Sequence, residues 1–130
     1  DFFLNNLNIS DHDSFKEIKD LKVSSHLYIK RNGEIIQFVP FNKRAWHAGD
    51  SVFKGVKNCN DFSIGIELEG ADDDIFTEEQ YNSLASATKE IIKKYPLISK
   101  DNITGHSDIA PSRKTDPGNK FDWEKYLKLV

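Results

Sequence analysis

A histidine and an aspartate stand at opposite ends of a loop near the C-terminus, and both side-chain types can bind a metal ion. His106 begins this loop, Asp116 lies near its end, and Lys114 comes two residues before the aspartate. A neutral imidazole and a carboxylate are both good zinc ligands. Because no short zinc signature fits this spacing, the plainer alternative stays open: a histidine at a strand end and an aspartate that opens the turn Asp116-Pro117-Gly118.

A second candidate for chemistry is Glu67, which lies in the middle of an apolar stretch. Residues 62–70 alternate in a way that predicts a strand, with Glu67, Glu69 and Gly65 on one face. Glu67 is either a solvated residue on an exposed sheet face or a general base in a cleft. Two carboxylates on one face favour the cleft, because like charges need compensating cations. Gly65 would let another group approach the backbone closely.

Aromatic and titratable side chains also occur outside these two regions. Trp46 and His47 lie on a long loop and form either a ligand platform or an aromatic lid over the core. His26, at the head of a predicted hairpin, is interpreted as structural, and His12 as solvated. Cys59 has no Cys-x-x-Cys partner, so we expect it to pack as a small apolar residue.

These candidates must be positioned by a small set of elements. The runs 25–30 and 35–39 around Asn32-Gly33 predict a hairpin with a type I′ turn. Residues 41–61 are expected to be irregular. Thr77 and Gln80 form a capping box that opens the best helix, which Pro96 closes. A short helix is predicted after Asp11 or Asp13, and a strand end at 103–106. A closing helix is predicted over 121–130, with three side chains packed inward: Trp123, Tyr126 and Leu127. Strands and helices in this order indicate an α/β or α+β sandwich.

Length and composition limit the classes of protein. The chain has 130 residues, 38% apolar and 30% charged, which is typical of one soluble globular domain. A net charge of −3 argues against a nucleic-acid partner, since a phosphate backbone calls for surplus Lys and Arg. No apolar run approaches the roughly 20 residues of a membrane span. One cysteine excludes an internal disulfide and favours a reducing compartment. The chain contains no methionine and begins at Asp1, so we expect it to be a processed, cloned or partial form.

Taken together, five stretches resemble the type 2 N-acetylmuramoyl-L-alanine amidase family in its cytoplasmic AmpD-type branch. They are VSSH at 23–26, RNGEI at 31–35, VPFNKRAWHAG at 39–49, CNDFSIGIELEG at 59–70 and TGHSDIAPSRKTDPG at 104–118. The similarity covers nearly the whole chain. It implies one amidase type 2 domain over 1–130. The expected fold is an α/β fold like that of peptidoglycan-recognition proteins, in which helices flank a mixed central sheet. We expect the first strand of that sheet to be missing from this chain.

The resemblance also implies an activity and a site. The expected reaction is zinc-dependent hydrolysis of the amide between the lactyl group of N-acetylmuramic acid, in its 1,6-anhydro form, and L-alanine, as part of cell-wall recycling in the cytoplasm. His106 and Asp116 would bind zinc, Glu67 would be the general base and Lys114 would stabilise the oxyanion. The remaining matches, expected to bind the muropeptide, are Trp46, His47, Asn60 and Arg113.

Two departures from the family pattern matter. The family's first zinc ligand is a histidine on an N-terminal strand upstream of everything that matches here, so we expect it in a segment before Asp1. Asn58 stands where some relatives carry an arginine, which leaves the peptide preference open. The alternatives are a non-catalytic peptidoglycan-binding module and a secreted or phage wall-lytic amidase. The expected partner is the muropeptide alone, bound by a monomer, without nucleic acid or membrane.

Overall fold

The computed structural model describes residues 25–71 and 73–130. The helix expected from Asp11 or Asp13, and His12 with it, lie outside the described residues. The described residues cluster into two compact units, 25–28 with 35–67 and 29–34 with 68–130. The single domain expected over 1–130 therefore stays a prediction. Within the described ranges, none of the helices combines the length and apolar character of a membrane span.

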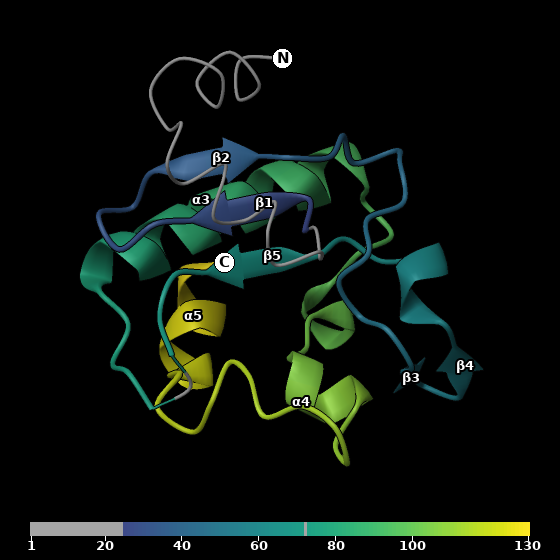
Figure 1. The fold of residues 1–130 in the computed structure, drawn as a ribbon. Helices are drawn as coiled ribbons and strands as arrows, with labels where there is room; N and C mark the ends of the chain where they lie inside the picture. Colours follow the sequence, from purple (N-terminus) through teal and green to yellow (C-terminus); the bar gives the residue numbers. More distant parts are fainter. Residues whose placement is uncertain (1–24, 72) are drawn as a thin grey trace. The chain divides into compact units, whose positions relative to one another are not determined.

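A three-stranded sheet is formed by β1 (Leu27–Ile29), β2 (Ile35–Gln37) and β5 (Ile66–Leu68), in the order β2-β1-β5 (Figure 1). The Phe38 N–H donates to the His26 carbonyl, which continues the antiparallel hairpin of β1 and β2. The Leu27 N–H donates to the Gly65 carbonyl and the Glu69 N–H to the Ile29 carbonyl, so the bonds advance along β1 and β5 together. That pattern is parallel. The mixed sheet expected from the resemblance is confirmed.

The hairpin at Asn32-Gly33 is confirmed, but the predicted type I′ turn is wrong. Gly33 has a φ of 90°, whereas Asn32 has no positive φ. The Gly33 N–H donates to the Lys30 carbonyl and the Lys30 N–H to the Glu34 carbonyl. These bonds describe a three-residue loop with glycine in the left-handed position. The structure thus needs positive φ at one residue instead of two.

Residues 41–61 are more regular than expected. They contain the antiparallel pair β3 (Val52–Phe53) and β4 (Val56–Lys57), followed by the short 3-10 helix η1 (Cys59–Asp61). The strand expected over 62–70 is limited to Ile66–Leu68, because Phe62 is the C-cap of η1 and residues 63–65 are irregular. Cys59 is buried with a free thiol, as expected for a small apolar packing residue.

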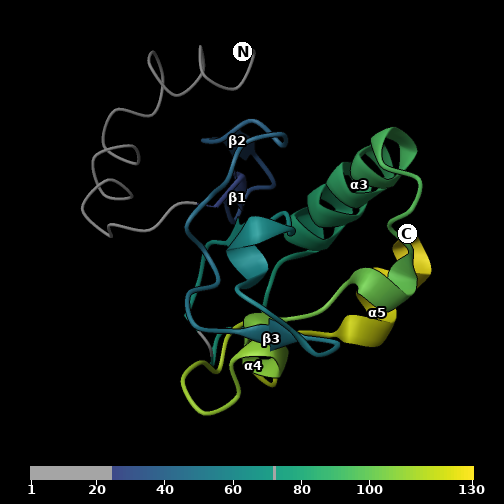
Figure 2. The ribbon, with the colours of Figure 1, turned by 90° about the vertical axis from the view of Figure 1, so that its right-hand side faces the viewer.

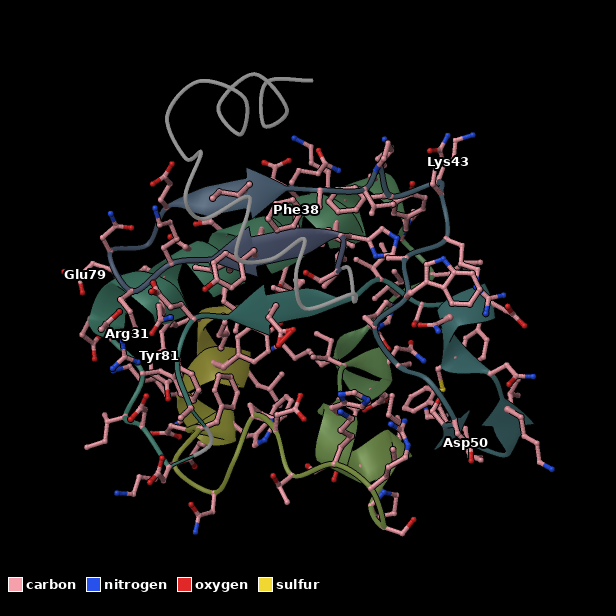
Figure 3. The ribbon with its side chains drawn as sticks, in the orientation of Figure 1. Arg31, Phe38, Lys43, Asp50, Glu79 and Tyr81 are labelled. Atoms are coloured by element: carbon pink, nitrogen blue, oxygen red, sulfur yellow. The ribbon has the colours of Figure 1, made fainter. Side chains whose placement is uncertain are left out.

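The second unit is built on α3 (Glu78–Lys94), and its capping box is confirmed. The Thr77 hydroxyl accepts from the Gln80 N–H, and the Gln80 side-chain oxygen accepts from the Thr77 N–H. The Gln80 side chain is 0% exposed, and its amide donates to the carbonyls of Glu69 (2.9 Å) and Ile29 (3.4 Å). The Thr77 hydroxyl also donates to the Arg31 carbonyl, so the turn that carries Arg31 lies beside the first turn of α3, where Figure 3 labels Glu79.

Three short helices complete this unit: η2 (Lys100–Asn102), α4 (His106–Ile109) and α5 (Trp123–Leu129). Helix α5 packs against α3 (Figure 2) through a hydrogen bond between the Thr88 and Tyr126 hydroxyls, 2.6 Å apart, and an ion pair between Glu78 and Lys125. The strand end expected at 103–106 is wrong, because His106 begins α4. The closing helix is confirmed, with Tyr126 buried and Trp123 and Leu127 partly buried.

Candidate active site

His106 and Asp116 converge, although ten residues separate them in the sequence. His106 is the first residue of α4, and the Nδ1 atom of its ring lies 3.2 Å from the Asp116 Oδ2 atom. The Ser107 N–H donates to the Asp116 carbonyl at 2.9 Å, which fixes the backbones on which both side chains stand. The side chains are 18% and 39% exposed, so the pair is sheltered but still accessible from solvent.

The electrostatics of the pair keep Asp116 ionised. The pKa of the Asp116 carboxyl is lowered, first by the hydrogen bond from His106, while partial burial opposes this and the charges of His106 and Lys114 assist it. A carboxylate that stays deprotonated is the form that binds a metal ion. The donor chemistry of this pair therefore suits a cation.

The geometry of the pair also fits zinc. Two ligands of one tetrahedral zinc ion, each about 2.0–2.2 Å from it, lie about 3.3–3.6 Å apart. The observed 3.2 Å between Nδ1 and Oδ2 is close to that separation. Across the part of the chain that the structure describes, no group of three or more His, Cys, Asp or Glu side chains is placed to hold a metal ion. Among the described residues, His106 and Asp116 are thus two candidate ligands.

Lys114 and Arg113 follow α4 on the loop that leads to Asp116. The N–H groups of both residues donate to the Ala110 carbonyl, which curls the chain back after α4. Lys114 is partly buried, and its charge contributes to the low pKa of Asp116. Arg113 is exposed. The structure therefore brings Lys114 into electrostatic range of the His106–Asp116 pair.

Glu67 lies in the middle of β5, with its side chain exposed, as the solvated-face and general-base interpretations both allow. The expectation that Gly65 admits a close neighbour is confirmed. A methyl group on Gly65 would lie 2.6 Å from the His47 Nδ1 atom and 2.7 Å from its Cδ2 atom. The ring of His47 therefore occupies the space beside the strand, just before Glu67.

Trp46, His47 and Asn60 form a second group of predicted site residues. The Asn60 side-chain oxygen accepts from the N–H groups of His47 (3.0 Å) and Ala48 (2.8 Å), so this buried amide holds the loop. Trp46 is 61% exposed, with the Arg44 guanidinium 4.1 Å from its ring centre. The alternative that Trp46 seals the core is wrong. That these residues, Glu67 and the His106–Asp116 pair face one cleft stays a prediction.

His26 is structural, as interpreted from the sequence. Its ring is buried, with Nε2 2.8 Å from the Lys43 carbonyl and Nδ1 accepting from the Gly65 N–H. Burial lowers the pKa of His26, and the Lys43 hydrogen bond partly offsets that. The sequence reasoning missed Gly105 and Trp123, which pack together beside His106. A glycine directly before a candidate ligand was the available signal.

The comparisons with known proteins identify the family. The family model for N-acetylmuramoyl-L-alanine amidase (Amidase_2) matches residues 2–119. The chain is 55% identical over 130 residues to "1,6-anhydro-N-acetylmuramyl-L-alanine amidase AmpD" of Haemophilus influenzae, covering 100% of this chain and 71% of that protein.

Two solved structures are similar in fold. A crystal structure of a Se-Met AmpD derivative has a TM-score of 0.82 at 55% identity, covering 93% of this chain and 67% of that chain. The E. coli amidase AmiD, in complex with the substrate anhydro-N-acetylmuramic acid-L-Ala-D-gamma-Glu-L-Lys, has a TM-score of 0.81 at 37% identity, covering 92% and 53%. Because the family model spans most of the chain and the identity is high, the chain belongs to the N-acetylmuramoyl-L-alanine amidase (Amidase_2) family.

Proposed function

We propose that this protein hydrolyses the amide bond between 1,6-anhydro-N-acetylmuramic acid and the L-alanine of muropeptides. The single observation that carries the proposal is the convergence of His106 and Asp116, two side chains of the kinds that bind zinc, within the residues that the family model matches. The Haemophilus relative is named for this amidase activity, and the AmiD structure contains an anhydro-muropeptide substrate.

In this proposal His106 Nδ1 and Asp116 Oδ2 hold a zinc ion, and a histidine upstream of Asp1 is the predicted third protein ligand. Zinc, when bound, polarises the scissile carbonyl and lowers the pKa of water. The Asp116 carboxylate needs no deprotonation at neutral pH, and zinc would take the place of the Nδ1 hydrogen that His106 donates to it in the metal-free pair. Both side chains remain partly exposed, so an ion can reach them.

Two further residues act on protons and charge. Glu67 accepts the proton that the attacking water loses and passes it to the leaving nitrogen of L-alanine. The Lys114 ammonium stabilises the negative charge that develops on the carbonyl oxygen. Its electrostatic effect on Asp116 supports a place for Lys114 near the metal-binding pair.

The substrate would be bound by Trp46, His47, Asn60 and Arg113. A sugar ring stacks well on an exposed indole face, and Trp46 offers one. Arg113 is exposed on the loop before Asp116, and a guanidinium can bind a stem-peptide carboxylate in bidentate fashion. The free, buried thiol of Cys59 is compatible with a reducing compartment, which supports the proposed cytoplasmic location. A monomer stays a prediction.

The test is hydrolysis of a purified anhydro-muropeptide by the complete gene product, with zinc content measured on the same samples. Release of the peptide, detected by mass spectrometry, is expected for the wild type and lost in His106→Ala and Asp116→Ala together with zinc. Asp101→Ala, which removes an exposed carboxylate from η2, is the matched control and should retain both.

A second candidate, a muropeptide-binding module without catalysis, is favoured by the presence of only two candidate ligands among the described residues. Binding of the muropeptide without peptide release, in a wild-type sample incubated with zinc, would establish that candidate and contradict the amidase.

A further inference from the structure

Gly105 and Pro117 flank the two proposed zinc ligands and contact each other. Gly105 comes directly before His106, and Pro117 directly after Asp116. A methyl group on Gly105 would lie 2.8 Å from the Pro117 Cδ atom and 3.0 Å from the Trp123 Cζ2 atom. The φ of Gly105 is −101°, which any residue adopts. The position therefore excludes a side chain for lack of space and not for backbone conformation.

The contact is matched by a hydrogen bond on the other side of His106. The Ser107 N–H donates to the Asp116 carbonyl at 2.9 Å. The segment 105–107 is thus joined to 116–117 both before and after His106. The distance between His106 and Asp116 is set by how closely these two backbone segments approach.

Trp123 is the rigid support for this approach. Its ring lies 4.8 Å from the Phe121 ring, nearly perpendicular to it, and 6.0 Å from the Tyr126 ring. Phe121 and Tyr126 are both buried, and Phe121 also stacks on Tyr81 at 5.4 Å. The indole cannot move away from Gly105 without disturbing its contacts with the Phe121 and Tyr126 rings.

We propose that Gly105 is a positioning residue for the metal site, and that with Pro117 and Trp123 it sets the separation of His106 and Asp116. The inference rests on the proposed function, because it assumes that this pair holds zinc. A side chain at position 105 would force 105–106 away from 116–117, which would widen the pair and weaken zinc binding.

The experiment compares Gly105→Ala with wild type in the complete gene product, by competition against a chelator. Changes in the shell around metal ligands typically cost about 10–100-fold in metal affinity, and we expect a loss in that range. Trp123→Phe removes the indole atom 3.0 Å from the new methyl group but leaves the Pro117 Cδ contact at 2.8 Å, so Gly105→Ala/Trp123→Phe should recover part of the lost affinity.

Thr88→Val is the control for a general loss of stability. It removes the hydroxyl that bonds to Tyr126 and touches neither Gly105 nor Pro117. This variant should unfold more easily and bind zinc with wild-type affinity. A crystal structure of metal-free Gly105→Ala should show the His106 Nδ1 to Asp116 Oδ2 distance beyond hydrogen-bond range, about 3.5 Å or more.

The outcomes separate the two proposals. If wild type binds zinc and Gly105→Ala binds it equally well, the positioning role is wrong. It is also wrong if the double variant shows no recovery, or if the metal-free distance is unchanged. If wild type takes up no zinc but the distance lengthens as expected, the positioning role stands and the zinc-dependent function fails.

Discussion

At the scale of single residues, Glu67 in β5 and Glu69 just after β5 differ in their surroundings. The Glu69 Oε1 atom accepts from the Arg31 N–H at 2.8 Å, so Glu69 holds the hairpin turn. Glu67 is exposed. A general base must reach the water that it deprotonates, and the exposed side chain of Glu67 is accessible to water.

The first prediction follows from this difference. Glu67→Gln keeps the shape of the side chain but cannot accept a proton, so turnover should fall by about 10²–10⁴-fold while zinc content is unchanged. Glu69→Gln is the matched control, because the amide oxygen can still accept from the Arg31 N–H. Muropeptide hydrolysis and zinc content of both variants check this. A Glu67→Gln rate above about half of the wild-type rate, far outside that range, would exclude Glu67 as the base.

The second prediction concerns His26, which is 1% exposed and is bonded through both ring nitrogens. Nδ1 accepts from the Gly65 N–H, so Nε2 carries the proton that is donated to the Lys43 carbonyl. Burial holds the pKa of His26 below its usual 6.5. Below about pH 6.5, His26 is therefore protonated in the unfolded chain while it stays neutral in the folded chain. The contribution of His26 to the free energy of unfolding is fully present above about pH 6.5, and it declines as the pH falls toward the folded-state pKa.

Urea unfolding between about pH 5 and 8 tests this dependence. His26→Asn should be less stable throughout, by about 1–3 kcal/mol, because two buried backbone groups lose a partner. It should also lose the part of the pH dependence due to His26. His47→Ala should keep that part, although its ring lies 5.8 Å from His26. An unchanged pH slope in His26→Asn would contradict the assignment.

At the scale of elements, Gly65, directly before β5, lies in close contact with the His47 ring of the 41–61 loop. The His47 backbone cannot give way easily, because its N–H and that of Ala48 are both held by the Asn60 side chain. The same glycine leads directly into Ile66 and Glu67. A side chain at position 65 would therefore displace either the His47 ring or the backbone that leads into β5.

The third prediction is that Gly65→Ala destabilises the protein by about 1–3 kcal/mol, the usual cost of overpacking. His47→Ala removes the ring that the new methyl group meets, so the double variant should be more stable than the sum of the single effects implies. Gly55→Ala is the comparison variant. Its φ of 84° strains the backbone, but its methyl group would meet nothing within 4 Å, so it measures strain without overpacking. Additive effects in the double variant, measured by denaturant unfolding, would contradict this contact.

At the scale of the whole molecule, the two units share strands of one sheet. β1 and β5 each contribute residues to both units, since the first unit includes Tyr28 and Glu67 and the second Ile29 and Leu68. Each unit therefore includes part of both strands, so complete unfolding of either unit would disrupt the sheet. We therefore expect a single cooperative unfolding transition, although the proposed ligands His106 and Asp116 both belong to the second unit.

The fourth prediction uses this cooperativity. A ligand that binds only the folded state stabilises it, by about 2.7 kcal/mol at a hundredfold excess over the dissociation constant. Zinc should therefore raise the single melting temperature by several degrees relative to chelator-treated protein. His106→Ala should melt at the same temperature with zinc and with chelator. Two separate transitions, of which zinc shifts only one, would contradict the shared unfolding, and no shift in wild type would contradict the zinc site.

Local patterns in the sequence determined several features by themselves. The capping box at Thr77 and Gln80 fixed the start of α3, because its hydrogen bonds join residues three apart. Asn32-Gly33 located the hairpin, and the motifs around Glu67, His106 and Asp116 identified the candidate chemistry through residue type and resemblance. Such signals are readable because every partner lies within a few positions, or because the motif is long enough to identify the family.

Tertiary structure decided what depends on partners far apart in the chain. The turn at Gly33 packs on Ser83 and Glu79 of α3, and it has a different loop type from the one that the local sequence predicts. The strand end expected at His106 became the start of α4. The approach of His106 to Asp116 depends on Gly105, Pro117 and Trp123, whose contacts have no period in the sequence. Close packing fixes such distances through the space that is left between side chains, and only the folded chain determines that space.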